Sequence, residues 1–291
     1  MNNSETLLVT GASGHLGKLV LDILLKGPKR KIIATTRNPE KLAEYAERGV
    51  TVRAADFNNL QSLDEAFKGA DRVLLISTDA IGSRISQHKN AIEAAKRAGV
   101  KHIVYTSYPN PDKAPAAVAP EHHETEKMIQ QSGLGYTFLR NNLYTDNLLS
   151  AISTALAMGA FAGTAGKGKT AYVTREDCAY AAAGALASAN TQNVIVDVTG
   201  PRAIDYNELA SIVSEIAGRP LPYVDMSEAD FKQALMKSGL PEAWADVFVS
   251  FDVTAKQGYA STVTNAVREL SGRVPKDIKE FLQENRQAFL K

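Results

Sequence analysis

Short apolar runs alternate through the first half of the chain with segments in which apolar residues recur every three or four positions. Most of the runs are continuous in Val, Ile and Leu, as expected for parallel strands that are covered on both faces. Strands are predicted at 6–10, 31–37, 50–56, 71–78, 101–107 and 135–140, and helices at 15–26, 39–48, 59–69, 84–98 and 121–131. Repeated β–α alternation predicts right-handed crossovers and an α/β fold with a Rossmann-type, doubly wound parallel sheet.

The rhythm changes after about residue 145, where helical patterns dominate. Thr174 and Asp177 have the spacing of a capping box at the start of an Ala-rich helix, and 193–200 predicts a strand that returns to the main sheet. Four further helical stretches follow, separated by Pro and Gly. We expect two units: a larger one from 1–146 together with about 172–200, and a smaller, mostly helical one from about 147–171 and 201–291, packed over the carboxyl ends of the strands.

Composition indicates an ordinary globular protein with a large core. The 291 residues are 44% hydrophobic, and 33 basic residues balance 32 acidic ones, so neither a nucleic acid nor a membrane is an expected partner. The single cysteine, Cys178, excludes an internal disulfide and a Cys-based zinc site, and its apolar neighbours favour a small buried residue over a catalytic thiol. The five histidines lack the spacing of a metal site. The polar start leaves no room for a signal peptide, which favours the cytoplasm.

A glycine-rich turn, "TGASGHLG", stands between the first strand and the first helix. Gly11 permits a positive φ, Gly14 lets the backbone approach a pyrophosphate, and Gly17 lets the helix pack closely on the strand. The amides and the positive end of the helix attract phosphates. In this strand–turn–helix context the motif predicts a dinucleotide site.

The end of the second strand indicates which dinucleotide is preferred. A carboxylate there would bind a ribose 2′-hydroxyl, but this chain has Arg37, whose guanidinium suits a 2′-phosphate, with Thr36 and Asn38 nearby. NADP(H) is therefore favoured over NAD(H). A solvated arginine at a strand end is the alternative.

Two further strand ends supply candidate contacts. Asp56 and Phe57 follow the third strand where an adenine would lie, although Asp56 could instead mark the start of the helix near Asn59. After the fourth strand, Ser77, Thr78 and Asp79 could border the nicotinamide ribose.

These motifs, together with "QHKNAIEAAKRAGVKHIVYTS", "EHHETEKMIQQSGLGYTFLRNNLYTDNLL" and "SGRVPKDIKEFLQEN", resemble in order and spacing the NmrA-like atypical short-chain dehydrogenase/reductases. The likeness is greatest to the quinone-reducing and triphenylmethane-reducing members. It covers nearly the whole chain and is most specific over the first 146 residues.

The resemblance implies an NADP(H)-binding unit and a smaller unit that closes a substrate cleft. By position, the implied cofactor residues are Thr10, Gly11, Ala12, Ser13, Gly14, His15, Leu16, Arg37, Asp56, Phe57, Ser77, Thr78, Asp79, Lys127, Asn141, Asn142, Leu143, Tyr144, Thr145 and Asp146. Lys127 would hold the ribose hydroxyls, and Asn142 and Tyr144 would contact the acceptor. An exposed helix lysine is the alternative for Lys127.

One departure from the short-chain reductases bears on the chemistry. Their general acid is a Tyr four residues before a Lys, but here His123 stands four residues before Lys127, and Tyr105 is not in register. His123 could donate a proton, or His122 and His123 could be solvated polar residues. Quinone reduction relaxes this demand, because a hydroquinone anion is a weak base that solvent can protonate.

The leading hypothesis is an NADPH-dependent oxidoreductase that transfers hydride directly to a quinone or a similar flat, electron-poor acceptor. The alternatives are a non-catalytic NADP-sensing regulator, and a reductase of triarylmethane dyes or other xenobiotics. A homodimer is possible. Trp244, Phe248 and Phe251 share one helix face and are expected to be core residues more often than pocket residues.

Overall fold

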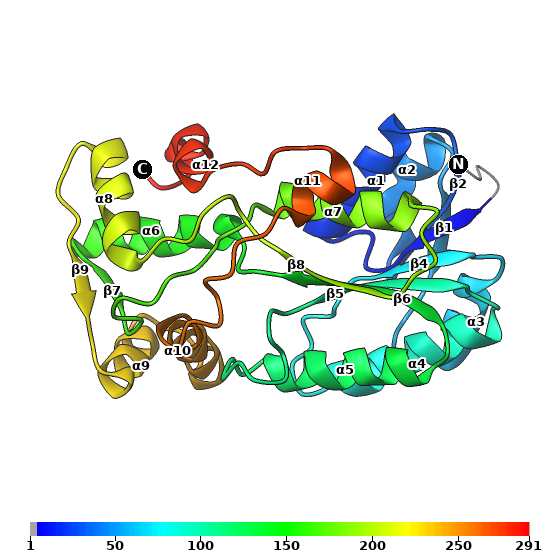
Figure 1. Cartoon of the computed structure of the whole chain (residues 1–291), viewed down its shortest axis with the longest axis horizontal. Coiled ribbons are helices and arrows are strands. Elements are labelled where there is room, and N and C mark those ends of the chain that lie inside the picture. The colour runs from blue at the N-terminus through cyan, green and yellow to red at the C-terminus, as the bar shows by residue number, and fades with distance from the viewer. Residues whose placement is uncertain (1–4, 291) are drawn as a thin grey trace.

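The main sheet has seven strands in the order β3-β2-β1-β4-β5-β6-β8, and every neighbouring pair is parallel. The computed structural model describes residues 5–290, and Figure 1 shows helices on both faces of this sheet. The predicted Rossmann-type fold is confirmed. The strands are β1 (Thr6–Val9), β2 (Lys31–Thr36), β3 (Thr51–Ala54), β4 (Arg72–Leu75), β5 (His102–Ser107), β6 (Gly135–Asn141) and β8 (Val194–Val198).

Two helical layers bury the two faces of the sheet. One core contains Leu7 and Val9 of β1, and the other contains Leu8, so three successive positions are apolar because both faces of the strand are covered. The first layer consists of α1 (His15–Lys26), α2 (Ala43–Glu47), α7 (Arg175–Ala187) and α11 (Ala266–Ser271). The second consists of α3 (Leu60–Phe67), α4 (Arg84–Arg97) and α5 (Ala119–Gln131).

Strand β4 is shorter than the sequence predicts. It ends at Leu75 rather than residue 78, because side chains take the next three amides in place of strand carbonyls. The Ile76 N–H binds Thr10 Oγ1 at 3.0 Å, the Ser77 N–H binds Thr106 Oγ1 at 2.8 Å, and the Thr78 N–H binds His88 Nε2 at 3.2 Å. Hydrogen bonds to side chains, rather than to a neighbouring strand, therefore fix the backbone of residues 76–78.

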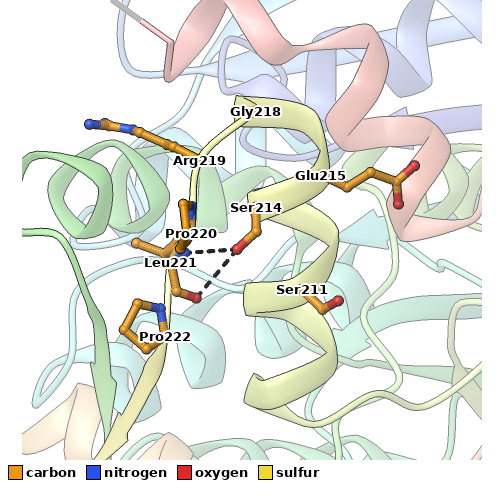
Figure 2. Close-up of a pocket in the computed structure, with 8 residues that line it drawn as sticks. All are labelled: Ser211, Ser214, Glu215, Gly218, Arg219, Pro220, Leu221 and Pro222. Atoms are coloured by element: carbon orange, nitrogen blue, oxygen red, sulfur yellow. Dashed lines mark hydrogen bonds between the residues drawn. The ribbon is translucent and has the colours of Figure 1, made fainter.

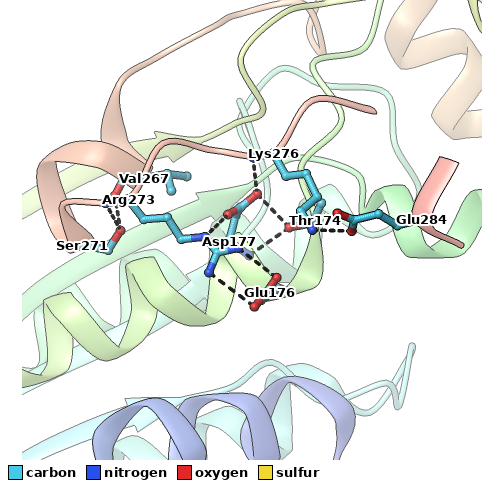
Figure 3. Close-up of polar contacts among 8 residues, drawn as sticks. All are labelled: Thr174, Glu176, Asp177, Val267, Ser271, Arg273, Lys276 and Glu284. Atoms are coloured by element: carbon cyan, nitrogen blue, oxygen red, sulfur yellow. Dashed lines mark hydrogen bonds and ion pairs between the residues drawn. The ribbon is translucent and has the colours of Figure 1, made fainter. Parts of the chain in front are cut away.

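The predicted capping box at the start of α7 is present and ties distant segments together (Figure 3). Thr174 Oγ1 accepts the Asp177 amide at 3.0 Å and donates to Asp177 Oδ2 at 2.8 Å. The same carboxylate accepts the Lys276 amide at 2.8 Å and pairs with Arg273 at 3.3 Å. Asp177 therefore fixes the chain between α11 and α12 (Ile278–Glu284) against α7.

The remaining elements form a smaller unit beyond the carboxyl ends of the strands (Figure 1). Leu148, Ile152, Leu209 and Leu282 belong to its core. Its elements are α6 (Leu148–Met158), β7 (Phe161–Gly163), α8 (Tyr206–Ala217), β9 (Tyr223–Asp225), α9 (Glu228–Lys237), α10 (Glu242–Lys256) and α12 (Ile278–Glu284). Along the whole chain, short 3-10 helices occur at Pro39–Leu42, Thr145–Asn147 and Arg286–Ala288. β8 joins β6 as expected, and the exact division into 1–146 plus about 172–200 and the rest stays a prediction.

A hollow of about 720 Å³ lies at the carboxyl end of α8 (Figure 2), and Figure 1 shows α8 on the opposite side of the molecule from α1. The Ser214 hydroxyl accepts the Leu221 amide at 2.8 Å and donates to the Ala210 carbonyl at 2.7 Å. This polar group is thus used in ordering the turn after the helix.

A buried carboxyl in the smaller unit makes stability depend on pH. Asp252 accepts the Tyr206 hydroxyl at 2.6 Å and the Thr164 amide at 2.7 Å, yet burial raises its pKa from 3.8 to about 6. A raised carboxyl pKa contributes stability that is fully present below the unfolded value and is lost as pH rises through the folded value. The free energy of unfolding should fall between about pH 4 and 6 by on the order of 3 kcal/mol from this group.

Asp252→Asn should remove this pH dependence of the free energy of unfolding. The Asn side chain is neutral at every pH, and its amide can still accept from the Thr164 N–H and donate to the Tyr206 hydroxyl. Denaturant unfolding at pH 4 and pH 7 should show the variant gaining stability relative to the unmodified protein as pH rises. The same change in the free energy of unfolding between pH 4 and pH 7 in both proteins would show that Asp252 is not the group responsible.

Within residues 5–290, no helix has the length and apolar character that crossing a membrane requires.

Candidate active site

A cavity of about 490 Å³ opens at the carboxyl edge of the sheet, where β1 and β4 lie side by side and their crossovers run to opposite faces. This is the switch point at which open α/β sheets bind their ligands. The cavity is lined by Gly11, Ser13, Gly14, His15, Leu16, Gly17, Thr35, Thr36, Arg37, Ala55, Asp56, Phe57, Asn58, Ile76, Ser77, Thr78, Asp79, Ala80, Gln87 and Arg175.

The glycine turn forms one wall. Gly11 has a φ of +57°, as predicted. A Cβ on Gly17 would lie 2.5 Å from the Gly11 carbonyl oxygen, so the close approach that requires Gly17 is to the turn rather than to the strand itself. Gly14 is the N-cap of α1 and no side chain caps this helix. The first-turn amides of a helix have no partners within it, which makes this wall a site for an anion.

Two predicted cofactor residues of the turn lie behind this wall. Thr10 and Ala12 have no exposed surface and do not line the cavity. Thr10 Oγ1 donates to the Leu74 carbonyl at 3.0 Å and so joins β1 to β4. These residues shape the turn from inside.

Arg37 lies at the rim with an exposed side chain and has no ion pair with any other residue in 5–290. Thr36 Oγ1 lies 2.8 Å from Ser13 Oγ, which connects this rim to the glycine turn. The Asn38 side chain is used elsewhere, since its Oδ1 caps the following 3-10 turn through the Glu40 amide. A cation without a partner beside an uncapped helix start suits a ligand with several phosphates.

Asp56 and Phe57 line the side of the cavity next to β3. Asp56 Oδ1 accepts the Asn58 amide at 2.9 Å, while the N-cap of α3 is Asn59, so the alternative in which Asp56 caps the helix is wrong.

Ser77, Thr78 and Asp79 line the cavity after β4. Their residue types supply hydroxyl and carboxylate groups, which suit the hydroxyls of a ribose. The Thr78 Oγ1 itself is buried, with no hydrogen-bond partner among the described residues, so it is not open to the cavity.

The segment from Asn141 to Asp146 begins at the end of β6 and is linked to the cavity through Arg175, which Asp146 and Tyr144 contact. Asn141 donates to the Tyr144 hydroxyl at 3.1 Å, and its own Oδ1 is buried without a partner among residues 5–290. Asn142 donates to the Ala260 carbonyl at 2.8 Å, and burial raises the pKa of the Tyr144 phenol. None of the residues Asn141, Asn142, Leu143, Tyr144, Thr145 and Asp146 is part of the cavity lining.

Arg175 is a charged lining residue that sequence reasoning missed, and the other missed lining residues are Thr35, Ala55, Asn58, Ile76, Ala80 and Gln87. Arg175 lines the cavity from the first turn of α7. Its guanidinium donates to the Asp146 carboxylate at 3.2 Å and lies over the Tyr144 ring, 5.3 Å from the ring centroid. The capping box at Thr174 is the signal that could have placed it, because a residue after an N-cap lies in the first turn of its helix.

Lys127 and His123 lie on α5 and do not line the cavity. The Lys127 ammonium is half exposed, 3.9 Å from the Glu124 carboxylate. His122 is buried and its Nδ1 lies 2.8 Å from the Tyr105 hydroxyl, so the interpretation of His122 as a solvated residue is wrong. Burial lowers the pKa of His122 well below its usual value, which keeps this imidazole neutral.

Outside the cavity, Cys178 is fully buried, as expected. The expectation that the aromatic residues of α10 are core is wrong for two of them, since Trp244 is 45% exposed and Phe248 43% exposed. Phe251 stacks on Tyr108 with ring centroids 6.1 Å apart. No group of three metal-ligating side chains occurs in the described part of the chain.

A doubly wound sheet with a glycine turn, a first helix that no side chain caps, and an arginine after β2 that has no ion pair within the described chain defines a Rossmann-type dinucleotide-binding protein. The model of the NmrA-like family matches residues 3–282. The chain belongs to this family, and the resemblance seen in its motifs is confirmed.

Individual relatives match along most of their length. Quinone oxidoreductase 2 of Escherichia coli (strain K12) is 42% identical over 253 residues, which are 87% of this chain and 88% of that protein. The E. coli NADPH-dependent quinone oxidoreductase QOR2 in complex with NADPH has a TM-score of 0.93 at 39% identity, covering 96% of this chain and 99% of that one. The triphenylmethane reductase of Citrobacter sp. in complex with NADP(H) has a TM-score of 0.87 at 35% identity, with coverages of 96% and 99%.

Proposed function

We propose that this protein is an NADPH-dependent oxidoreductase that reduces quinones or similar flat, electron-poor compounds. The observation that carries the proposal is the cavity at the switch point, which has an uncapped helix start and Arg37, without an ion pair among residues 5–290, on one side and Ser77, Thr78 and Asp79 on another. Relatives that act on quinones and on triphenylmethane dyes support it.

The chain's own residues divide the work of holding the cofactor. The first-turn amides of α1 bind the pyrophosphate, Arg37 binds the 2′-phosphate, and Asp56 and Phe57 border the adenine. Ser77, Thr78 and Asp79 bind the ribose next to the nicotinamide, and Arg175 adds positive charge near the phosphates. When bound, NADPH supplies the hydride.

The reduction makes a small demand on acid catalysis. A quinone that accepts a hydride becomes a hydroquinone anion, a weak base that takes its proton from water. The protein then contributes chiefly by orienting the acceptor. The roles of Lys127 at the ribose, of Asn142 and Tyr144 at the acceptor, and of His123 as a proton donor stay predictions.

Purified protein mixed with NADPH and a panel of small quinones should show acceptor-dependent loss of the absorbance of the reduced cofactor. Triphenylmethane dyes belong in the same panel, because they separate the two acceptor classes. The protein without NADPH is the control for direct reaction with an acceptor. No acceptor-dependent oxidation of NADPH anywhere in the panel would contradict the proposal.

We further propose a cytoplasmic location and, as a possible assembly, a homodimer. The balanced charge of +1 and the single cysteine support the first. Sedimentation of the purified protein tests the second.

A further inference from the structure

The loop after β4, residues 76–82, forms one wall of the cavity and is held in place by side chains. Its Thr78 amide donates to Nε2 of His88, a residue of α4 with no exposed surface, at 3.2 Å. Thr78 is itself one of the residues that line the cavity, so the position of its backbone amide affects the shape of this wall.

The hydrogen bonds of His88 allow one tautomer. Thr125 Oγ1 donates its only proton to the Glu121 carbonyl at 2.8 Å, so it accepts a proton from His88 Nδ1, 2.9 Å away. Nε2 then carries the lone pair that the Thr78 N–H requires. Burial and the charge of Arg84 lower the pKa of His88 to about 3, so the ring stays neutral.

The same loop has a second attachment that does not involve His88. Arg84 donates from Nε to the Thr78 carbonyl at 2.7 Å and pairs with Glu121 at 3.2 Å. Glu121 in turn accepts the Gly82 amide at 2.9 Å. This buried pair holds the carbonyl side of Thr78 while His88 holds its amide, so loss of His88 alone should shift the loop without releasing it.

Other residues of α4 reach the loop on the opposite side of the cavity. Asn90 donates to the Phe57 carbonyl at 2.8 Å, and Gln87 donates to Asn58 Oδ1 at 3.3 Å. The Phe57 ring meets the imidazole of His88 edge-on, with centroids 6.5 Å apart. His88 therefore contacts residues from both loops that flank the cavity.

We infer that His88 is a positioning residue for the cofactor site: it accepts the Thr78 amide and packs against Phe57, and so sets the distance between the two loops that hold the two ends of the cofactor. The inference rests on the proposed function, because the ligand it positions is NADPH. His88 lies outside the cavity lining and acts through Thr78 and Phe57.

The test compares His88→Leu with His88→Gln. Leucine fills similar space and leaves the Thr78 amide without its acceptor, so the Kd for NADPH should rise about tenfold. Glutamine places an oxygen near the position of Nε2 and should restore the Kd to within about threefold of the original. The KM for a quinone should change little in either variant, and thermal melting reports whether each is folded.

Thr125→Val keeps the inference testable if His88→Leu does not fold. Valine removes the acceptor of the Nδ1 proton and frees the imidazole to take the other tautomer, which presents an N–H to the Thr78 amide. NADPH binding should weaken in the same direction, while Thr125→Ser, which retains the hydroxyl, should bind normally.

Two results would overturn the inference alone: NADPH binding by folded His88→Leu equal to that of the unmodified protein, or His88→Gln as weak as His88→Leu. Failure of the unmodified protein to bind NADPH would overturn the proposed function as well. If His88 has only a structural role, the variants with lower melting temperatures should show both a higher Kd for NADPH and a higher KM for the quinone.

Discussion

Replacement of Arg37 by alanine should weaken the binding of NADPH roughly 10- to 100-fold and leave the affinity for NADH nearly unchanged. Arg37 lines the cavity, is exposed, and has no ion pair with residues 5–290. Its guanidinium is therefore available to a 2′-phosphate, a group that NADH lacks. The substitution therefore removes charge-assisted hydrogen bonds from NADPH and removes no contact from NADH.

Titration of both cofactors into both proteins measures the effect as a ratio of Kd values. Lys41→Ala is a suitable control, because it removes an exposed cation from the adjoining 3-10 turn that does not line the cavity. The Kd of Arg37→Lys for NADPH should lie between those of the unmodified protein and Arg37→Ala, since an ammonium keeps the charge but loses the bidentate geometry. Equal losses for NADPH and NADH would remove Arg37 from this role.

The second large effect is on folding. Gly184→Ala should lower the free energy of unfolding by about 3 kcal/mol, because a Cβ at this position would lie 1.9 Å from the Leu270 carbonyl oxygen. That oxygen belongs to the backbone of α11, so the clash cannot be relieved by a side-chain rotation. The two helices would have to move apart.

Gly27→Ala is the matched control for that substitution. Gly27 follows α1 with extended backbone, and an added Cβ would meet its nearest heavy atom at 3.5 Å, an ordinary contact. Denaturant unfolding should place this variant within about 0.5 kcal/mol of the original protein. Similar losses in both variants would show that the helix contact is not the cause.

Repeating local patterns made most of the architecture predictable from sequence. Apolar runs and helical periods identify the order of the strands and helices of the main sheet, and the glycine turn and Arg37 lie on the cavity where the pattern places them. Each of these signals is contained within one element and its immediate turn.

The features that sequence reasoning missed depend on partners far along the chain. The end of β4 shifts because Thr106 and His88 take the amides that follow it, and neither is marked as a partner by its neighbours. His122 is buried because the Tyr105 hydroxyl meets it from β5. The α11 helix has six residues, too few to establish a helical period.

The position of α11 also bears on how the chain is made. Ala266 and Val267 belong to the same buried core as Leu7 and Val9 of β1, which are translated long before them. This core therefore stays incomplete until residues 266 and 267 have been synthesised. A nascent chain that ends before α11 is expected to leave part of the apolar surface of α7 uncovered.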